Sequence, residues 1–179
     1  MLIYSIEEVK ILLESDETEI VSYAIGSIKK KQYMFICYEK EKNVYLKSSE
    51  YDSEELVGFI QEFSQNDMTK SEALEKVIME DAFIDAYKRK FVRAIEMENS
   101  VLKGLTEQVD NISINYPKTK YNGLDGFSLD CYTPKWDKRL HLWCHSVDKY
   151  FQPVIDLANY LLDFKGVDAG YRFRLVKNS

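Results

Sequence analysis

The sequence predicts an α+β fold, with antiparallel sheet structure and segregated helices in the order α-βββ-αα-βββ-α-β. Two groups of strand-like runs, rich in Val, Ile, Tyr and Phe, are separated by short polar turns, which is typical of hairpins. Helix-capping motifs precede other segments, whose apolar residues recur at helical spacing. Strands and helices therefore occupy separate stretches of the chain.

The length of 179 residues, with 45% hydrophobic and 30% charged residues, is enough for one buried core. We expect a single domain over residues 1–179. The alternative is two lobes that share this core, an α-βββ-α lobe over residues 1–66 and a βββαβ lobe over residues 107–179. A long helical segment over residues 69–104 would join them. Whether the strands form one sheet or two is left open.

The first third of the chain predicts one helix and a three-stranded meander. The S-x-x-E capping box that starts at Ser5 begins the helix, which ends in the polar stretch 14–18. The strands that follow span residues 19–28, 32–38 and 43–47. Their connections are short, so neighbouring strands should pair antiparallel. Ile28 falls on the face of the small residues, so we expect the first strand to end or bulge at Gly26-Ser27.

The middle of the chain predicts two helices. A capping signal at Asp52 precedes a helix whose buried face consists of Leu56, Phe59, Ile60 and Phe63. A second capping signal at Thr69 opens a long helix to about Lys103, and Gly104 provides its C-terminal stop. Glu80 and Glu98 interrupt the apolar stripe of this helix, which leaves a break or an exposed flank open.

The last third returns to strands. They are expected over residues 111–116, 126–133 and 139–147. A helix is expected over residues 150–164, because Pro153 suits its first turn and Gly166 lies past its end. Residues 171–176 alternate apolar and Arg side chains and predict a closing, half-buried strand.

Charge and hydropathy exclude several classes of partner. The net charge of −6 opposes sequence-independent binding to nucleic acid, which needs several Lys or Arg contacts to phosphate. The longest apolar run spans residues 33–38, well short of the roughly 18 residues that a membrane helix needs. The three cysteines form no C-x-x-C pair, as is usual in a reducing compartment. We therefore expect a cytoplasmic protein with neither a nucleic-acid nor a membrane partner.

Both histidines lie in the segment from Asp130 to Asp148. If the strands over residues 126–133 and 139–147 form a hairpin, apolar residues pair along one of its faces. These pairs are Phe127 with Cys144, Leu129 with Leu142, and Cys131 with Leu140. The opposite face pairs Asp130 with His141, so the hairpin predicts a carboxylate that holds the imidazole ring.

A helix over residues 137–147 is the competing interpretation. It would place four potential metal ligands on one outer face, Asp137, His141, His145 and Asp148. Histidines four residues apart on a helix suit a divalent ion, whereas on a strand they lie about 13 Å apart and cannot share one. The strand is preferred, so we expect neither a metal nor another cofactor. His141, Asp130 and His145 remain candidates for general acid–base catalysis.

Aromatic and acidic side chains are the candidates for a protein-binding surface. Tyr and Trp combine a large apolar area with one polar group, and Trp136 in the hairpin loop is the best candidate for an exposed one. Acidic side chains would suit a partner with a basic surface. The candidate binding residues are Trp136, Tyr132, Trp143, Tyr121, Glu17, Glu19, Glu54 and Glu55.

The sequence favours a non-catalytic intracellular protein-binding module that blocks a partner protein. A small acidic chain with 13 Tyr is similar in general character to bacterial and phage inhibitors, including immunity proteins and anti-defence proteins. No Walker A, dinucleotide-binding or nucleophile-elbow motif is present in the sequence. The alternative is a metal-assisted or general acid–base enzyme centred on His141 and His145.

Overall fold

The computed structural model describes residues 12–52, 54–55, 58, 61–62, 72, 80–91, 93–95, 100–112, 126–136, 139–144, 147–168 and 173, and each structural statement below refers to these residues. The strands are β1 (Thr18–Ile28), β2 (Lys31–Lys40), β3 (Asn43–Asp52), β4 (Arg93–Ile95), β5 (Ser128–Tyr132) and β6 (Leu140–Trp143). The helices are α4 (Asp81–Phe91), α5 (Ser100–Asp110), the 3₁₀ turn η1 (Lys149–Phe151) and α6 (Gln152–Phe164).

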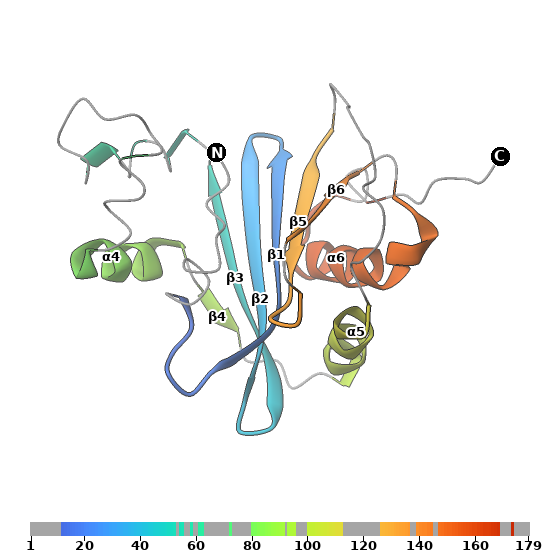
Figure 1. The fold of residues 1–179 in the computed structure, drawn as a ribbon. Coiled ribbons are helices and arrows are strands. Elements are labelled where there is room, and N and C mark those ends of the chain that lie inside the picture. Colours follow the sequence, from blue (N-terminus) through green and yellow to red (C-terminus); the bar gives the residue numbers. More distant parts are fainter. Residues whose placement is uncertain are drawn as a thin grey trace.

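The described strands form one antiparallel sheet in the order β4-β3-β2-β1-β5-β6 (Figure 1). The predicted α+β class is therefore confirmed. The two groups of strands also join, because β5 pairs with β1 from Ser22 opposite Tyr132 to Gly26 opposite Ser128. The question of one sheet or two is settled for the described strands in favour of one.

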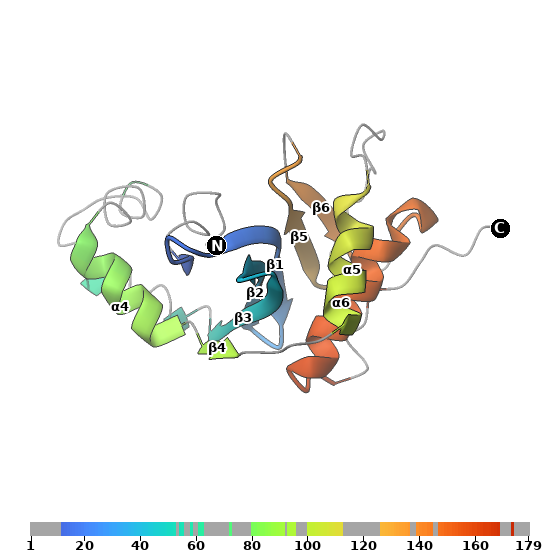
Figure 2. The ribbon, with the colours of Figure 1, turned by 90° about the horizontal axis from the view of Figure 1, so that it is seen from below.

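Helices α5 and α6 cover one face of the sheet, and α4 lies on its other side together with the beginning of the described chain (Figure 2). The face under α5 and α6 presents every second residue of β1, β2 and β5, and these residues form the main apolar core. The Tyr23 hydroxyl of β1 donates a 2.9 Å hydrogen bond to the Val154 carbonyl of α6. This bond gives the buried hydroxyl an acceptor and joins α6 to the sheet.

The predicted meander β1-β2-β3 is confirmed, and two tight turns produce it. Lys29 and Lys30 both have positive φ, and so do Glu41 and Lys42. Two consecutive residues in this conformation match the right-handed twist of a two-residue hairpin, although Asn and Gly are the residues that favour it. The predicted irregularity near Gly26 is also confirmed, because the β1–β2 register shifts between Gly26 and Ile28.

Strand β3 is longer than expected and pairs with β2 along its whole length, from Asn43 to Asp52. The sequence prediction ended this strand at Lys47, because polar residues follow. The ladder continues because backbone groups form it, and Ser48 and Ser49 are buried within it.

The prediction of one long helix to about Lys103 is wrong. Helix α4 ends at Phe91, the short strand β4 pairs with the edge of β3, and α5 begins at Ser100. The backbone of β3 would otherwise leave hydrogen-bonding groups unpaired along that edge, and β4 satisfies some of them. Gly104 lies inside α5 and does not end a helix.

The C-terminal helix was predicted closely. Asp148 caps the 3₁₀ turn η1, and α6 follows with a proline in its first turn. Gly166 has a φ of 72° just past the end of α6, a conformation that glycine adopts without a steric penalty. No helix within the described ranges is both long enough and apolar enough to cross a bilayer.

Several predicted elements lie wholly or mostly outside the described residues. The predicted helix that starts at Asp52 is described at residues 54–55, 58 and 61–62, which are helical, whereas Asp52 itself ends strand β3. The others are the first helix before Leu12, most of the segment from residue 69 to residue 80, the strand over residues 111–116, and the closing strand over residues 171–176 apart from Phe173.

Candidate functional site

The β5–β6 hairpin brings Asp130 and His141 together as predicted. The register places Asp130 opposite His141, and the Nδ1 atom of His141 lies 3.0 Å from Oδ1 of Asp130. The Asp130 side chain is 9% exposed, whereas the His141 side chain is 61% exposed. On the neighbouring strand β1, Asp130 faces Ala24, whose small side chain leaves room for the carboxylate.

This geometry fixes which nitrogen of the ring faces solvent. A carboxylate oxygen accepts hydrogen bonds, so the Nδ1–H group of His141 is the donor. When the ring is neutral, its Nε2 atom carries the lone pair that a general base requires, and the side chain is 61% exposed. The pair can therefore exchange a proton with a bound molecule, in addition to its structural contribution to the hairpin.

The competing helical interpretation of residues 137–147 is wrong where the structure describes them, because Leu140–Trp143 is a strand. Asp148, a proposed metal ligand, instead accepts a 2.9 Å hydrogen bond from the Tyr150 amide and caps η1. Within the described ranges, no three metal-ligating side chains gather. Asp137 and His145 lie outside the described residues.

The predicted exposure of Trp136 is wrong. Its side chain is buried, and its indole N–H donates a 3.0 Å hydrogen bond to the Ile112 carbonyl. The loop folds back at this point, because the Trp136 amide donates to the Thr133 carbonyl. The large apolar ring thus joins the core, and its removal from water stabilises the folded state.

The remaining aromatic candidates are not prominent on the surface either. Tyr132 is buried, and Trp143 is half-buried. A Cβ at Gly126 would lie 3.0 Å from Cζ2 of Trp143 and 2.7 Å from Sγ of Cys144, so only glycine permits this packing. Tyr121 lies outside the described residues.

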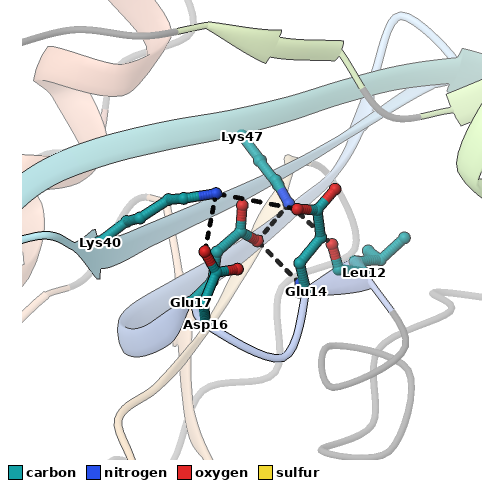
Figure 3. A network of polar contacts seen from close by, with 6 residues as sticks. All are labelled: Leu12, Glu14, Asp16, Glu17, Lys40 and Lys47. Carbon is teal, nitrogen blue, oxygen red and sulfur yellow. Dashed lines mark hydrogen bonds and ion pairs between the residues drawn. The ribbon is translucent and has the colours of Figure 1, made fainter.

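A second polar cluster, which the sequence did not predict, lies where the chain enters β1 (Figure 3). Lys47 of β3 forms an ion pair with Glu17, and their side chains are only 7% and 4% exposed. The Lys47 ammonium also donates a 3.1 Å hydrogen bond to the Leu12 carbonyl and lies 5.0 Å from the centre of the Tyr38 ring. Burial, followed by the nearby Glu17 carboxylate, raises the pKa of Tyr38 to about 12.

Glu17 is therefore not the exposed binding residue that the sequence predicts. It anchors a turn over residues 14–17, which we call the acidic turn. The Glu14 amide donates a 2.9 Å hydrogen bond to Oε2 of Glu17, and the Glu17 amide donates a 3.1 Å bond to the Glu14 carbonyl. A lysine among the alternating residues of β3 was the available signal, since a buried Lys requires a carboxylate partner.

The other acidic side chains of the acidic turn face outward. Glu14 and Asp16 are 66% and 58% exposed, and Lys40 of β2 lies 3.8 Å and 3.0 Å from their carboxylate oxygens. The hydrogen bond from Lys40 lowers the pKa of Asp16, and the same bond raises the pKa of Lys40. Asp16 and Lys40 therefore both stay charged at neutral pH.

The remaining acidic candidates differ in exposure. Glu19 is half-buried and accepts a 2.7 Å hydrogen bond from the Ser22 hydroxyl. Glu54 and Glu55 are exposed, and Glu54 lies 3.6 Å from Lys30. Only Glu54 and Glu55 are thus placed on the surface as predicted.

Comparison of the chain with family models, with curated proteins and with solved structures finds no match.

Proposed function

We propose that the protein is a non-catalytic protein-binding module, of the inhibitor, immunity or anti-defence type, that uses the acidic turn to block a partner protein with a basic surface. One observation carries this proposal. The buried ion pair of Lys47 and Glu17 fixes the backbone of the turn, while Glu14 and Asp16 remain exposed on it.

A fixed turn favours binding because less conformational entropy is lost when the partner docks. Ordering a mobile interface side chain costs about 0.5–1.5 kcal/mol, and a preformed surface avoids part of that cost. The Leu12 carbonyl and the Glu17 carboxylate both hold Lys47, so the turn is attached to the sheet at two points.

The charge around the turn supports a basic partner. Thr18 directly follows the acidic turn, and Glu39 of β2 lies opposite it. Glu41 lies close by along the chain, in the turn between β2 and β3. Both glutamate side chains are exposed. Lys40 offsets only part of the negative charge of Glu14 and Asp16. Complementary charge mainly raises the rate of association and determines which partners are accepted.

The test is affinity capture of the tagged chain from its host, followed by mass spectrometry and a binding titration with the recovered partner. Glu14→Lys with Asp16→Lys should weaken binding at least tenfold, since like charges would then meet (about 1.4 kcal/mol per tenfold change). The dependence of affinity on salt should also fall.

The matched control reverses two exposed acidic residues on the helices that cover the opposite face, Glu107→Lys in α5 and Asp156→Lys in α6. It changes the net charge by the same amount, so it should leave affinity within about twofold if the acidic turn is the interface. Equal losses in both double variants would sink the proposal, because the effect would then come from net charge alone.

A general acid–base enzyme is the second candidate, and the 3.0 Å contact between Asp130 and the exposed His141 favours it. A panel of activated carboxylate and phosphate esters would test it. If His141 is the base, His141→Ala should lower a hydrolysis rate at least about a hundredfold with the fold retained. An unchanged rate in this variant would exclude the role of His141 in that reaction.

A further inference from the structure

A cavity of about 340 Å³ lies between the β1–β2 hairpin and the C-terminal end of α6. It is at the opposite end of β1 from the acidic turn and involves none of its residues. The volume matches the lower range of small-molecule sites, about 300–1,000 Å³, and would hold roughly ten water molecules.

Two hydrogen-bond donors line this cavity without a side-chain partner among the described residues. The first is the hydroxyl of Tyr33, a residue that is only 6% exposed as a whole. The second is the ammonium group of Lys165, at the end of α6. Neither group is a buried polar atom without a partner, so solvent reaches both of them and both can donate to a bound acceptor.

The charge of the lining is positive, although the chain as a whole is acidic. Lys29, Lys31 and Lys165 contribute three ammonium groups, and Glu50 and Asp168 contribute two carboxylates. Lys31 forms an ion pair with Glu50, so these two charges largely cancel. The rest of the lining therefore keeps more positive than negative charge.

The backbone amides of Gly166 and Val167, at the end of α6, are already hydrogen-bonded and are not available to a ligand. The Gly166 amide donates to the Asp163 carbonyl at 2.9 Å, and the Val167 amide donates to the Leu162 carbonyl at 3.0 Å. These bonds satisfy carbonyl groups that a helix end otherwise leaves open.

Burial, followed by the nearby Glu50 carboxylate, raises the pKa of Tyr33, so its hydroxyl remains a hydrogen-bond donor at neutral pH.

We propose that this cavity binds a small organic anion, whose carboxylate or phosphate-monoester oxygens accept hydrogen bonds from the Tyr33 hydroxyl and the Lys165 ammonium group. An oxyanion satisfies both donors at once and balances the positive lining. The apolar side chains of Ile28 and Val167, which also line the cavity, leave space for a short carbon skeleton beside the anionic group.

The experiment is an NMR titration of the ¹⁵N-labelled full chain with glycerol 3-phosphate in one arm and succinate in the other. Sodium chloride at equal ionic strength is the control for salt effects. At least one arm should give saturable shifts at the amides of Tyr33 and of residues 165–168, with a Kd of about 1 mM or tighter. Saturation by the phosphate ester alone or by the dicarboxylate alone identifies which oxyanion the cavity prefers.

Two conservative variants and their matched controls complete the test. Tyr33→Phe and Lys165→Gln should each weaken binding roughly tenfold, because each removes one charge-assisted hydrogen bond. Tyr150→Phe and Lys149→Gln, on η1 and away from the cavity, should leave the Kd within about twofold.

Stability distinguishes this role from a purely structural one. Tyr33→Phe should not lower the thermal midpoint of the free protein, since its hydroxyl has no hydrogen-bond partner among the described residues. The proposal is overturned if neither anion saturates, if the shifts follow ionic strength alone, or if the control variants weaken binding as much as the cavity variants do.

Discussion

Two polar pairs on the same face of the sheet differ mainly in how deeply they are buried. The Lys47 and Glu17 side chains are 7% and 4% exposed, whereas His141 is 61% exposed beside an Asp130 side chain that is 9% exposed. The strand registers place Lys47 and Asp130 on one face, opposite the helices α5 and α6. The first pair is buried away from an external partner, whereas the second carries a ring that is mostly exposed.

When two pairs consist of similar chemical groups, their burial decides whether they only stabilise the fold or can also contact another molecule. A buried pair stabilises the fold only as a unit, because either member alone would be an uncompensated charge. An exposed member can replace its partner by water at little cost in free energy, and it can also contact another molecule. The following changes test this difference, from the largest expected effect to the smallest.

Replacing Lys47 by Met should lower the free energy of unfolding by about 3–5 kcal/mol, because Glu17 would remain buried without its partner. Urea denaturation measures the change. Combining it with Glu17→Leu should recover most of the loss, since two apolar side chains can pack in place of the pair. A loss below about 1 kcal/mol for Lys47→Met would mean that the pair is solvated, contrary to its burial.

Replacing Gly126 by Ala should cost about 1–3 kcal/mol and disturb the hairpin that carries His141. The added Cβ would lie 2.7 Å from Sγ of Cys144, at a φ of 138° that residues other than glycine rarely adopt. Gly104→Ala is the matched control, because no atom lies within 4 Å of its Cβ position inside α5. That control should be neutral or stabilising by up to about 1 kcal/mol. If both variants behave alike, the close packing at Gly126 is not important for stability.

Replacing His141 by Ala should lower the free energy of unfolding by less than about 1 kcal/mol, because removing a ring that is 61% exposed lets water reach the Asp130 carboxylate and replace the lost partner. The same urea titration provides the measurement, and the wild-type midpoint is the reference. A loss as large as that of Lys47→Met would remove the distinction between the two pairs.

The smallest effect at neutral pH is expected at Tyr38, and it should grow in alkali. The pKa of Tyr38 is about 12 in the folded chain against an ordinary value of 10.0. Between these pH values the unfolded chain releases the proton while the native chain retains it, so stability falls as pH rises. Tyr38→Phe should make stability fall less steeply from pH 9 to pH 11.5. Parallel curves for wild type and Tyr38→Phe would contradict the account.

The register of the β5–β6 hairpin could be predicted to the residue, although both strands are shorter than expected, whereas the element before α5 could not be predicted. Both faces of the hairpin are consistent in only one register, because a shift by one residue would move Asp130 into the core. Residues 93–95 also fit a helical pattern, and they form β4 only because the distant strand β3 offers an edge for pairing. That information is not local, so a periodicity argument cannot supply it.

The predictions that Glu17 and Trp136 are exposed failed for the same reason. Lys47 and Glu17 are 30 residues apart, and nothing in their immediate sequence indicates that they pair. Trp136 is in a loop, as expected, but a loop position does not determine whether the ring faces solvent or folds back beneath Ile112. The exposed acidic side chains of Glu54 and Glu55 were easier to predict, because a capping motif usually lies on the surface.

The buried pair of Lys47 and Glu17 holds the acidic turn in one conformation, and amide hydrogen exchange is the measurement that can show this. The Glu14 and Glu17 amides donate the two hydrogen bonds that close the turn. The account predicts slowed exchange at both amides in the wild type, fast exchange in Lys47→Met, and unchanged protection of the β1–β2 ladder in the folded variant. Fast exchange of both amides in the wild type, or protection that survives Lys47→Met, would contradict it.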